Sequence, residues 1–172
     1  MAAIAKAAGL PKPNLHYYFG SKRALYRAVL EQTLREWLQP ADTIVAGADP
    51  RTALECYIRE KMRLSFTRPY ASRVWANELL HGAPELRGTL VRTLRPLMRA
   101  KAAVIEQWIA QGRLAPVDSM HLFFTIWAST QTYADFEVQV CALLGRASLN
   151  GEAQARATQH VVSLILRGCG LA

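Results

Sequence analysis

Side chains that can contact nucleic acid are concentrated in the segment KPNLHYYFGSK, residues 12–22. A lysine can bind a phosphate or a guanine edge, and an asparagine can pair with adenine. Tyrosine and histidine can donate hydrogen bonds to phosphates, and a proline can touch a thymine methyl group. This chemistry is that of DNA recognition. The candidate DNA-contacting residues are Lys12, Pro13, Asn14, His16, Tyr17, Tyr18, Ser21 and Lys22.

The distribution of charge also favours an anionic partner for this end of the chain. The chain of 172 residues carries a formal net charge of +8. Five cations and no acid fall within the first 30 residues, so the remainder carries only +3. A solvated basic helix face is the simpler alternative. A membrane-surface helix is disfavoured because the segment lacks a strong apolar face and a glycine–proline turn interrupts it.

The elements around this segment predict a helix-turn-helix. Residues 1–8 are alanine-rich and predict a short helix that ends at Gly9. Residues 12–18 predict a second helix, because prolines are tolerated in a first helical turn. Ser21 is expected to cap a third helix over residues 22–39. In such a motif the second helix lies in the major groove of DNA.

The order of three short segments, IAKAAGL, NLHYYF and SKRALY, resembles the helix-turn-helix of the TetR/AcrR family of one-component regulators. The resemblance covers residues 3–30 without a gap. It implies a TetR-like, all-α fold and a ligand-responsive, DNA-binding repressor. Two positions depart from the family pattern. Pro11 replaces the usual Ser or Thr cap, at a cost of about 1 kcal/mol, and His16 replaces the usual tyrosine.

In that family a further helix precedes the helix-turn-helix, and the printed chain starts after the position of that helix. A start assigned too late and a shortened product would both give this arrangement. If the chain begins here, the apolar side chains of Ile4, Leu15 and Phe19 lack their main packing partner. The head is then truncated, and we expect weak or absent DNA binding in a salt-titrated assay.

The rest of the chain also predicts helices and no convincing strand. Helical segments are expected over about 51–67, 70–81, 84–111, 118–145 and 151–166. Pro96 lies inside the third of these segments and should kink or split it. The predicted fold is therefore all-α, with a truncated helix-turn-helix head over residues 1–30 and an effector-binding and dimerisation body over residues 31–172.

The stretch TIWASTQTYADFEVQV, residues 125–140, places polar groups among apolar ones on one helix. Buried polar groups need partners, so these groups either bond one another or meet a ligand. The body resembles a branch of the family whose effector is uracil or thymine, in segments such as YIREKMRLS and PYASRVWANELLHGAPEL. A small planar ligand needs amide-like partners and an aromatic wall. The candidate effector-binding residues are Trp75, Asn77, Glu78, Trp127, Ser129, Gln131 and Tyr133.

The last two helices, which begin at Asp118 and Gly151, are expected to pair with those of a second copy. The resemblance implies this arrangement, a four-helix homodimer. The apolar residues that suit it are Leu143, Leu144, Val161, Leu164 and Ile165; in the alternative, a monomer buries them in its own core. A dimer sets two heads one DNA turn or more apart, and this predicts a pseudo-palindromic operator. Effector and DNA then favour different separations of the heads.

Other classes of function have little support in the residues. The four histidines show no HExxH-type spacing and no nucleophile motif occurs, so we expect neither catalysis nor a metal or other cofactor. Three distant cysteines and no visible signal peptide indicate a cytoplasmic protein with reduced thiols and no membrane span. The predicted role is control of pyrimidine or nitrogen metabolism. The alternatives are a sensor of another small molecule and a helical dimer that does not bind DNA.

Overall fold

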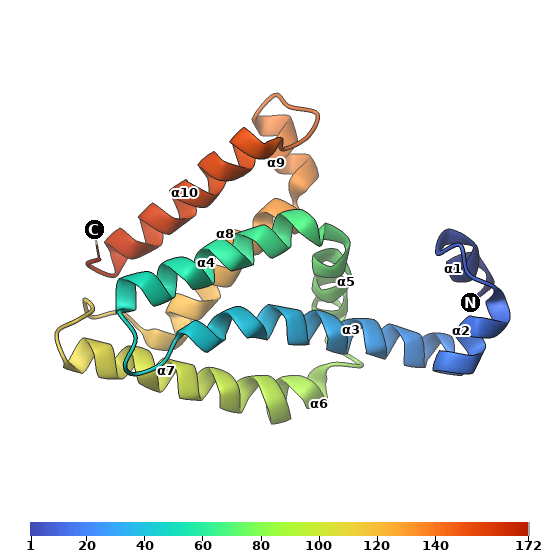
Figure 1. The fold of residues 1–172 in the computed structure, drawn as a ribbon, viewed down its shortest axis with the longest axis horizontal. Coiled ribbons are helices and arrows are strands. Elements are labelled where there is room, and N and C mark those ends of the chain that lie inside the picture. Colours follow the sequence, from blue (N-terminus) through green and yellow to red (C-terminus); the bar gives the residue numbers. More distant parts are fainter. Residues whose placement is uncertain (172) are drawn as a thin grey trace.

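A computed structural model of the protein describes residues 1–171. Helices and their connections account for these residues, and no strand occurs among them, which confirms the all-α prediction. The long helix α3 (Lys22–Leu38) joins a small head, made of α1 (Ala2–Ala7) and α2 (Lys12–Phe19), to a larger helical body. Figure 1 shows the head projecting from the body at one end of α3.

The local geometry of the head follows from its glycines and its capping residues. Gly9 has a φ of +64°, and the amide of Leu10 donates to the Ala5 carbonyl at 3.0 Å, which closes α1 with a left-handed residue. Pro11 precedes α2 without giving it a side-chain cap, as its residue type predicts. The hydroxyl of Ser21 accepts from the Ala24 amide at 3.1 Å, so the predicted cap of α3 is confirmed.

Acidic and amide side chains begin the main helices of the body. Asp49 caps α4 (Pro50–Thr67), Asp118 caps α8 (Ser119–Asp135) and Asn150 caps α10 (Gly151–Gly168); each oxygen accepts a backbone N–H three residues on, at 2.8–3.0 Å. A short 3₁₀ segment, Gln39–Thr43, follows α3. Helix α5 (Pro69–Leu80) crosses α3 (Figure 1). No helix within residues 1–171 is both long and apolar enough to cross a membrane.

The helix predicted over 84–111 is irregular. It starts as α6 (Arg87–Thr89), widens into a π-helical turn over Leu90–Leu94 and continues as α7 (Arg95–Ala110). The wide turn ends just before Pro96, which lacks an amide hydrogen and whose ring clashes with an α-helical carbonyl four residues earlier. The predicted disturbance at this proline is confirmed. The predicted start at residue 84 was three residues too early.

A single helix over 118–145 was also predicted, and this prediction was wrong. The chain leaves helical geometry at Phe136, where φ is −116° and ψ is 29°, and resumes as α9 (Glu137–Leu143). The cause lies on α5, far away in sequence. Arg73 Nε donates to the Ala134 carbonyl at 2.9 Å, and Ser72 Oγ donates to Asp135 Oδ1 at 2.5 Å. These bonds fix the end of α8.

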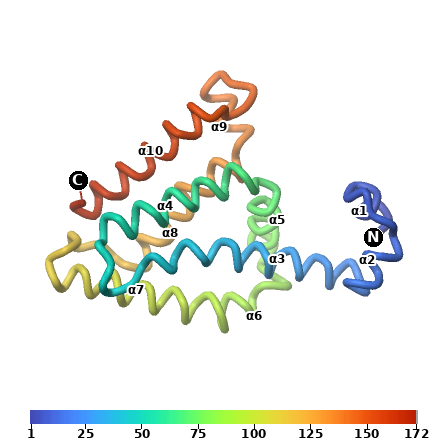
Figure 2. The backbone as a smooth tube through the Cα atoms, in the orientation of Figure 1, coloured from blue at the N-terminus to red at the C-terminus, as the bar shows by residue number. Residues whose placement is uncertain are grey.

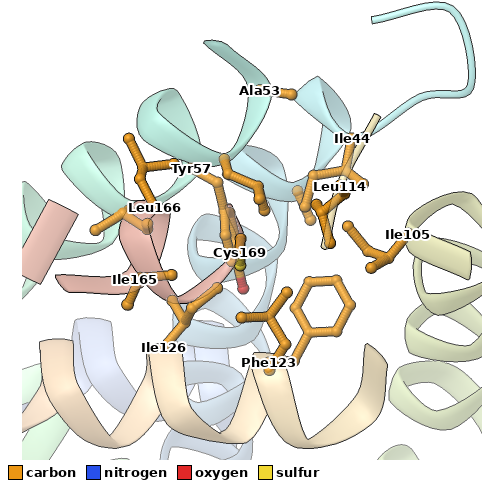
Figure 3. Packing of buried hydrophobic residues seen from close by; sticks show 14 of the residues in the cluster. Ile44, Ala53, Tyr57, Ile105, Leu114, Phe123, Ile126, Ile165, Leu166 and Cys169 are labelled. Atoms are coloured by element: carbon orange, nitrogen blue, oxygen red, sulfur yellow. The ribbon is translucent and has the colours of Figure 1, made fainter. Parts of the chain in front are cut away.

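The main core lies between α4, α7, α8 and α10. Figure 3 shows Tyr57 of α4 close to Phe123 and Ile126 of α8 and to Ile165 of α10. Val161 and Ile165 are buried in this core. They were predicted to serve a dimer interface, and the structure corrects this, because burial within their own chain leaves them no surface to offer. Figure 2 shows α10 running back beside α4 and ending far from the head.

A second, smaller core joins α3 to α5. Leu30, Leu34 and Trp37 of α3 pack against Trp75 of α5 and Leu86, and the rings of Trp37 and Trp75 lie 5.8 Å apart. Removing such large side chains from water contributes about 1.5–3 kcal/mol each, so α3 is held firmly along its second half. A hollow separates this small core from the main one.

Candidate functional site

The head presents all eight predicted DNA-contacting residues to solvent. Tyr17 and Tyr18 are 84% and 73% exposed, and their rings meet edge to face at 5.1 Å. Leu15, on the inner side of α2, is buried. Ile4 of α1 and Phe19 of α2 are half-buried. The outer face of α2 is therefore polar and basic, as a surface for DNA requires.

Two of these eight residues also hold the head together. The Nδ1 atom of His16 lies 3.3 Å from the Gly20 carbonyl, and the Ser21 hydroxyl caps α3. Lys22 follows at the first turn of this helix of 17 residues. The partial positive charge of the helix end and the lysine favour a phosphate at the same place.

The hollow between the two cores is a cavity of about 230 Å³. It is smaller than the usual sites for drug-sized ligands, so it suits a single ring. Its walls come from α3, α4, α5, α8 and the π-helical turn. They comprise three indole rings, five leucines and three polar side chains: Trp37, Trp75, Trp127, Leu34, Leu38, Leu79, Leu90, Leu94, Tyr57, Lys61 and Gln131.

Three of the seven predicted effector residues meet in this cavity, namely Trp75, Trp127 and Gln131. The other four lie elsewhere. Asn77 is exposed and lines a neighbouring hollow of about 400 Å³ that shares Trp75 and Gln131. That hollow, between α5 and the end of α8, adjoins the cavity.

Ser129 and Tyr133 lie on other faces of α8. Ser129 is half-buried and is not part of the cavity wall. The ring of Tyr133 packs 5.9 Å from that of Phe66 and lines an open groove between α8 and α10. The helical period explains both placements, because residues two positions from Gln131 point to different sides of the helix.

Glu78 is buried, but its carboxylate faces away from the cavity. Its Oε2 atom accepts from the Tyr26 hydroxyl at 2.9 Å, and its Oε1 atom accepts from the amides of Glu85 and Leu86 at 2.6 and 3.2 Å. Burial and the bond to Glu78 raise the pKa of Tyr26 to about 12. Through these hydrogen bonds, the Glu78 carboxylate connects α5 to the loop after α5 and to the first half of α3.

Sequence reasoning missed the five leucines of the cavity wall and three of its aromatic or polar residues, Trp37, Tyr57 and Lys61. Lys61 is only 3% exposed, and its Nζ atom lies 4.2 Å from the centre of the Trp37 ring. Burial lowers the pKa of Lys61 to about 8, although the charge of Asp135 opposes this. The available signal was its position, because a lysine four residues after Tyr57 and three after Ile58 falls on the apolar face of α4.

Tyr57 and Trp127 are linked across the cavity wall. The indole Nε1 of Trp127 donates to the Tyr57 hydroxyl oxygen at 2.8 Å. Burial raises the pKa of Tyr57 to about 12, so its hydroxyl keeps its proton at neutral pH. This bond fixes the plane of the Trp127 ring.

Comparison with known proteins gives the class of the molecule. The family "Bacterial regulatory proteins, tetR family" matches residues 1–29, and "YcdC-like protein, C-terminal region" matches residues 30–172. The chain therefore belongs to the TetR family of bacterial transcriptional regulators. It is a DNA-binding regulator with a helix-turn-helix, and not an enzyme.

Curated relatives narrow the position within the family. The HTH-type transcriptional regulator RutR of Escherichia coli K12 is 46% identical over 166 residues, which are 96% of this chain and 78% of RutR. RutR of Shigella flexneri gives the same values. The HTH-type transcriptional regulator BetI of Rhizobium meliloti is 29% identical over 136 residues, which are 71% of this chain and 66% of BetI.

Proposed function

We propose that this regulator is a cytoplasmic repressor, released from its operator by a pyrimidine base, uracil or thymine, and that it controls pyrimidine or nitrogen metabolism. The observation that carries the proposal is the cavity in which Trp75, Trp127 and Gln131 meet. Indole rings can stack on a flat base, and a side-chain amide can pair with a carbonyl and a ring N–H of the imide type. The likeness to RutR supports the same ligand class.

DNA recognition falls to the head in this proposal. Residues 1–30 form the reading unit and residues 31–172 the sensing and dimerising unit; Ala172 lies outside the described residues. The eight exposed residues of α2 and the start of α3 supply the contacts. Those at the beginning of α2, Lys12, Pro13 and Asn14, reach base edges, and the tyrosines reach phosphates.

The route from cavity to head runs through the loop that follows α5. Trp75 lines the cavity and Glu78, one turn later, receives the Tyr26 hydroxyl of α3. The same loop carries Glu85, whose carboxylate accepts from Arg23 Nε at 2.7 Å. A shift of α5 on ligand binding therefore pulls on the part of α3 that adjoins the head. Such coupling amounts typically to about 1–3 kcal/mol.

A homodimer completes the proposal. Large apolar side chains remain exposed on α8, α9 and α10 and the turns beside them: Phe124, Phe136, Val138, Leu143, Leu144 and Leu164. An exposed apolar surface of this kind marks a protein interface. Pairing through it sets two heads on one face of DNA, which calls for a pseudo-palindromic operator.

A retardation assay tests the proposal. Duplexes selected from a random-sequence pool are titrated with the protein over a range of salt concentrations, with and without uracil or thymine. We expect the base to weaken binding by about tenfold to a hundredfold. Trp127→Ala and Gln131→Ala should bind DNA like the wild type and ignore the base.

Two outcomes favour the alternatives. If other small molecules release the DNA and pyrimidines do not, the protein is a sensor of a different ligand. If no duplex is retained even at low salt, where phosphate contacts are strongest, the chain is a helical dimer that does not bind DNA.

A further inference from the structure

We infer that the effector is bound as an anion and that Lys61 is its counter-ion. The effector is then a planar ring whose imide N–H loses its proton on binding. This inference rests on the proposed function and adds the charge state of the ligand and the residue that selects it. It narrows the ligand class from planar polar rings to planar rings with an acidic N–H group.

The first observation is that the Lys61 ammonium is buried and lacks a partner. Within residues 1–171 its ammonium makes neither a hydrogen bond nor an ion pair, and it lies over the face of the Trp37 ring, 4.2 Å from the ring centre. In the same part of the chain, every side-chain nitrogen or oxygen that is fully sealed from solvent does have a partner. The Nζ atom must therefore face open space, and the space that Lys61 lines is the cavity.

The second observation is that hydrogen-bond donors outnumber acceptors in the cavity. Lys61 brings three N–H groups, and Gln131 brings an NH₂ group and one carbonyl oxygen. The Tyr57 hydroxyl oxygen accepts a hydrogen bond from the Trp127 indole N–H, and the Tyr57 O–H has no acceptor within the described chain. Among the described residues that line the cavity, none is a carboxylate. Such a site favours a ligand that mainly accepts.

None of the acidic groups of the described chain near Lys61 serves as its counter-ion. Asp135 of α8 is the nearest acid, but Ser72 occupies one of its oxygens at 2.5 Å and burial raises the pKa of its carboxyl. The carboxylate of Glu78 of α5 accepts hydrogen bonds from Tyr26 and two backbone amides. On α4, Tyr57 is neutral. A buried cation without a partner is costly, so an anion that enters the cavity relieves this cost.

An ionised imide fits these donors. Loss of the ring N–H proton spreads negative charge over the nitrogen and the two flanking carbonyl oxygens. These three acceptors lie in one plane, and the cavity wall offers three side chains that can donate to them, Lys61, Tyr57 and Gln131. With Lys61 already protonated, the imide proton passes to the buffer. With Lys61 neutral, its amine takes the proton, so no other reactant is needed.

Isothermal titration with a graded series of pyrimidines tests the inference. Thymine, uracil, 5-fluorouracil and 5-nitrouracil have increasingly acidic ring N–H groups, and 1,3-dimethyluracil has none to lose. We expect wild-type affinity to rise along the series in proportion to the ionised fraction, and the dimethyl compound not to bind. Near pH 7, uracil binding should release close to one proton, measured in buffers of different ionisation enthalpy.

Variants separate charge from shape. Lys61→Met keeps the length and apolar character of the stem, and it should lose the dependence on acidity. Lys101→Met is the control, because Lys101 is a half-buried lysine that donates to the Ile44 carbonyl away from the cavity. This control should keep the wild-type trend.

Three results would overturn the inference. Equal affinity along the series, or uracil binding without proton release, contradicts it while the proposed function stands. A folded Lys61→Met protein whose affinity still rises with the acidity of the ligand also contradicts the inference and leaves the proposed function intact. If no pyrimidine binds the wild type, both the inference and the proposed ligand class fail.

Discussion

Replacement of Lys61 by methionine should make the ligand-free protein more stable at neutral pH. A substitution in a core usually destabilises, so the sign of this prediction is informative. It follows from one feature of the molecule, namely a lysine that is only 3% exposed and lines an apolar cavity. Methionine fills nearly the same volume and carries no charge to desolvate.

The magnitude can be worked from two opposing contributions. Burial lowers the pKa of Lys61 from 10.5 to about 8. At about 1.4 kcal/mol per pKa unit, the charged form costs the folded state about 3 kcal/mol at pH 7. The contact with Trp37 returns about 1 kcal/mol, and methionine loses it. The net expectation is a gain of about 2 kcal/mol in the free energy of unfolding.

The pH dependence gives a second, independent readout. Because the pKa of Lys61 is lowered by folding, the unfolded chain binds more protons between about pH 8 and 10.5. Wild-type stability therefore gains from rising pH in this window, and below pH 8 the full cost is present. The methionine variant lacks this contribution, so its advantage should shrink as the pH approaches 10.5.

Urea unfolding of both proteins from pH 7 to 10.5, followed by circular dichroism, measures these differences. Differences between the two proteins are the quantity of interest, because the raised pKa values of Tyr26, Tyr57 and Cys169 affect both alike. A variant that is less stable than wild type at pH 7, with a constant difference at higher pH, would contradict this prediction. It would mean that Lys61 is well solvated or paired.

Four further predictions concern packing, coupling, assembly and DNA. Tyr26→Phe and Glu78→Gln should each lower the free energy of unfolding by about 1 kcal/mol, and a double-mutant cycle should show that the losses are not additive. Phe123→Ala should cost about 3–5 kcal/mol in the same urea assay, because this ring is fully buried. Leu164→Glu should leave the circular dichroism spectrum unchanged but shift the protein to a monomer in sedimentation, because Leu164 is 61% exposed. Lys12→Ala should weaken binding to all duplexes alike and reduce the salt slope by about 1 in the retardation assay.

The head could be predicted closely because its signals are local. The glycine that ends α1, the tolerance for Pro13 in a first helical turn and the Ser21 cap act through neighbours a few residues away. Exposure of the predicted DNA-contacting residues follows from the same helix, which buries Leu15 on its inner side.

The body shows where local reasoning ends. The break at Phe136 depends on Arg73 and Ser72, which lie more than 60 residues earlier. Glu78 looked like a ligand group from its residue type, but Tyr26 of α3 bonds one of its oxygens and two amides of the loop after α5 bond the other.

The cavity itself was half predictable. A glutamine and tryptophans within an apolar helix attract attention to a possible ligand site, and Gln131 and Trp127 do lie in the cavity wall. Lysines are almost always exposed, so the sequence offered no reason to expect Lys61 in the cavity wall. Its burial depends on how α3 and α5 close over α4, and this is a property of the tertiary structure.

We expect the effector to bind beside Gln131, in the cavity between the two cores, and not in the groove between α8 and α10. Calorimetric titration of uracil into the wild type, Gln131→Ala and Gln159→Ala tests it most directly, because Gln131 lines the cavity and Gln159 lines the groove between α8 and α10. We predict one site per chain, lost in Gln131→Ala and retained in Gln159→Ala. Loss of binding in Gln159→Ala together with wild-type binding in Gln131→Ala would contradict the account.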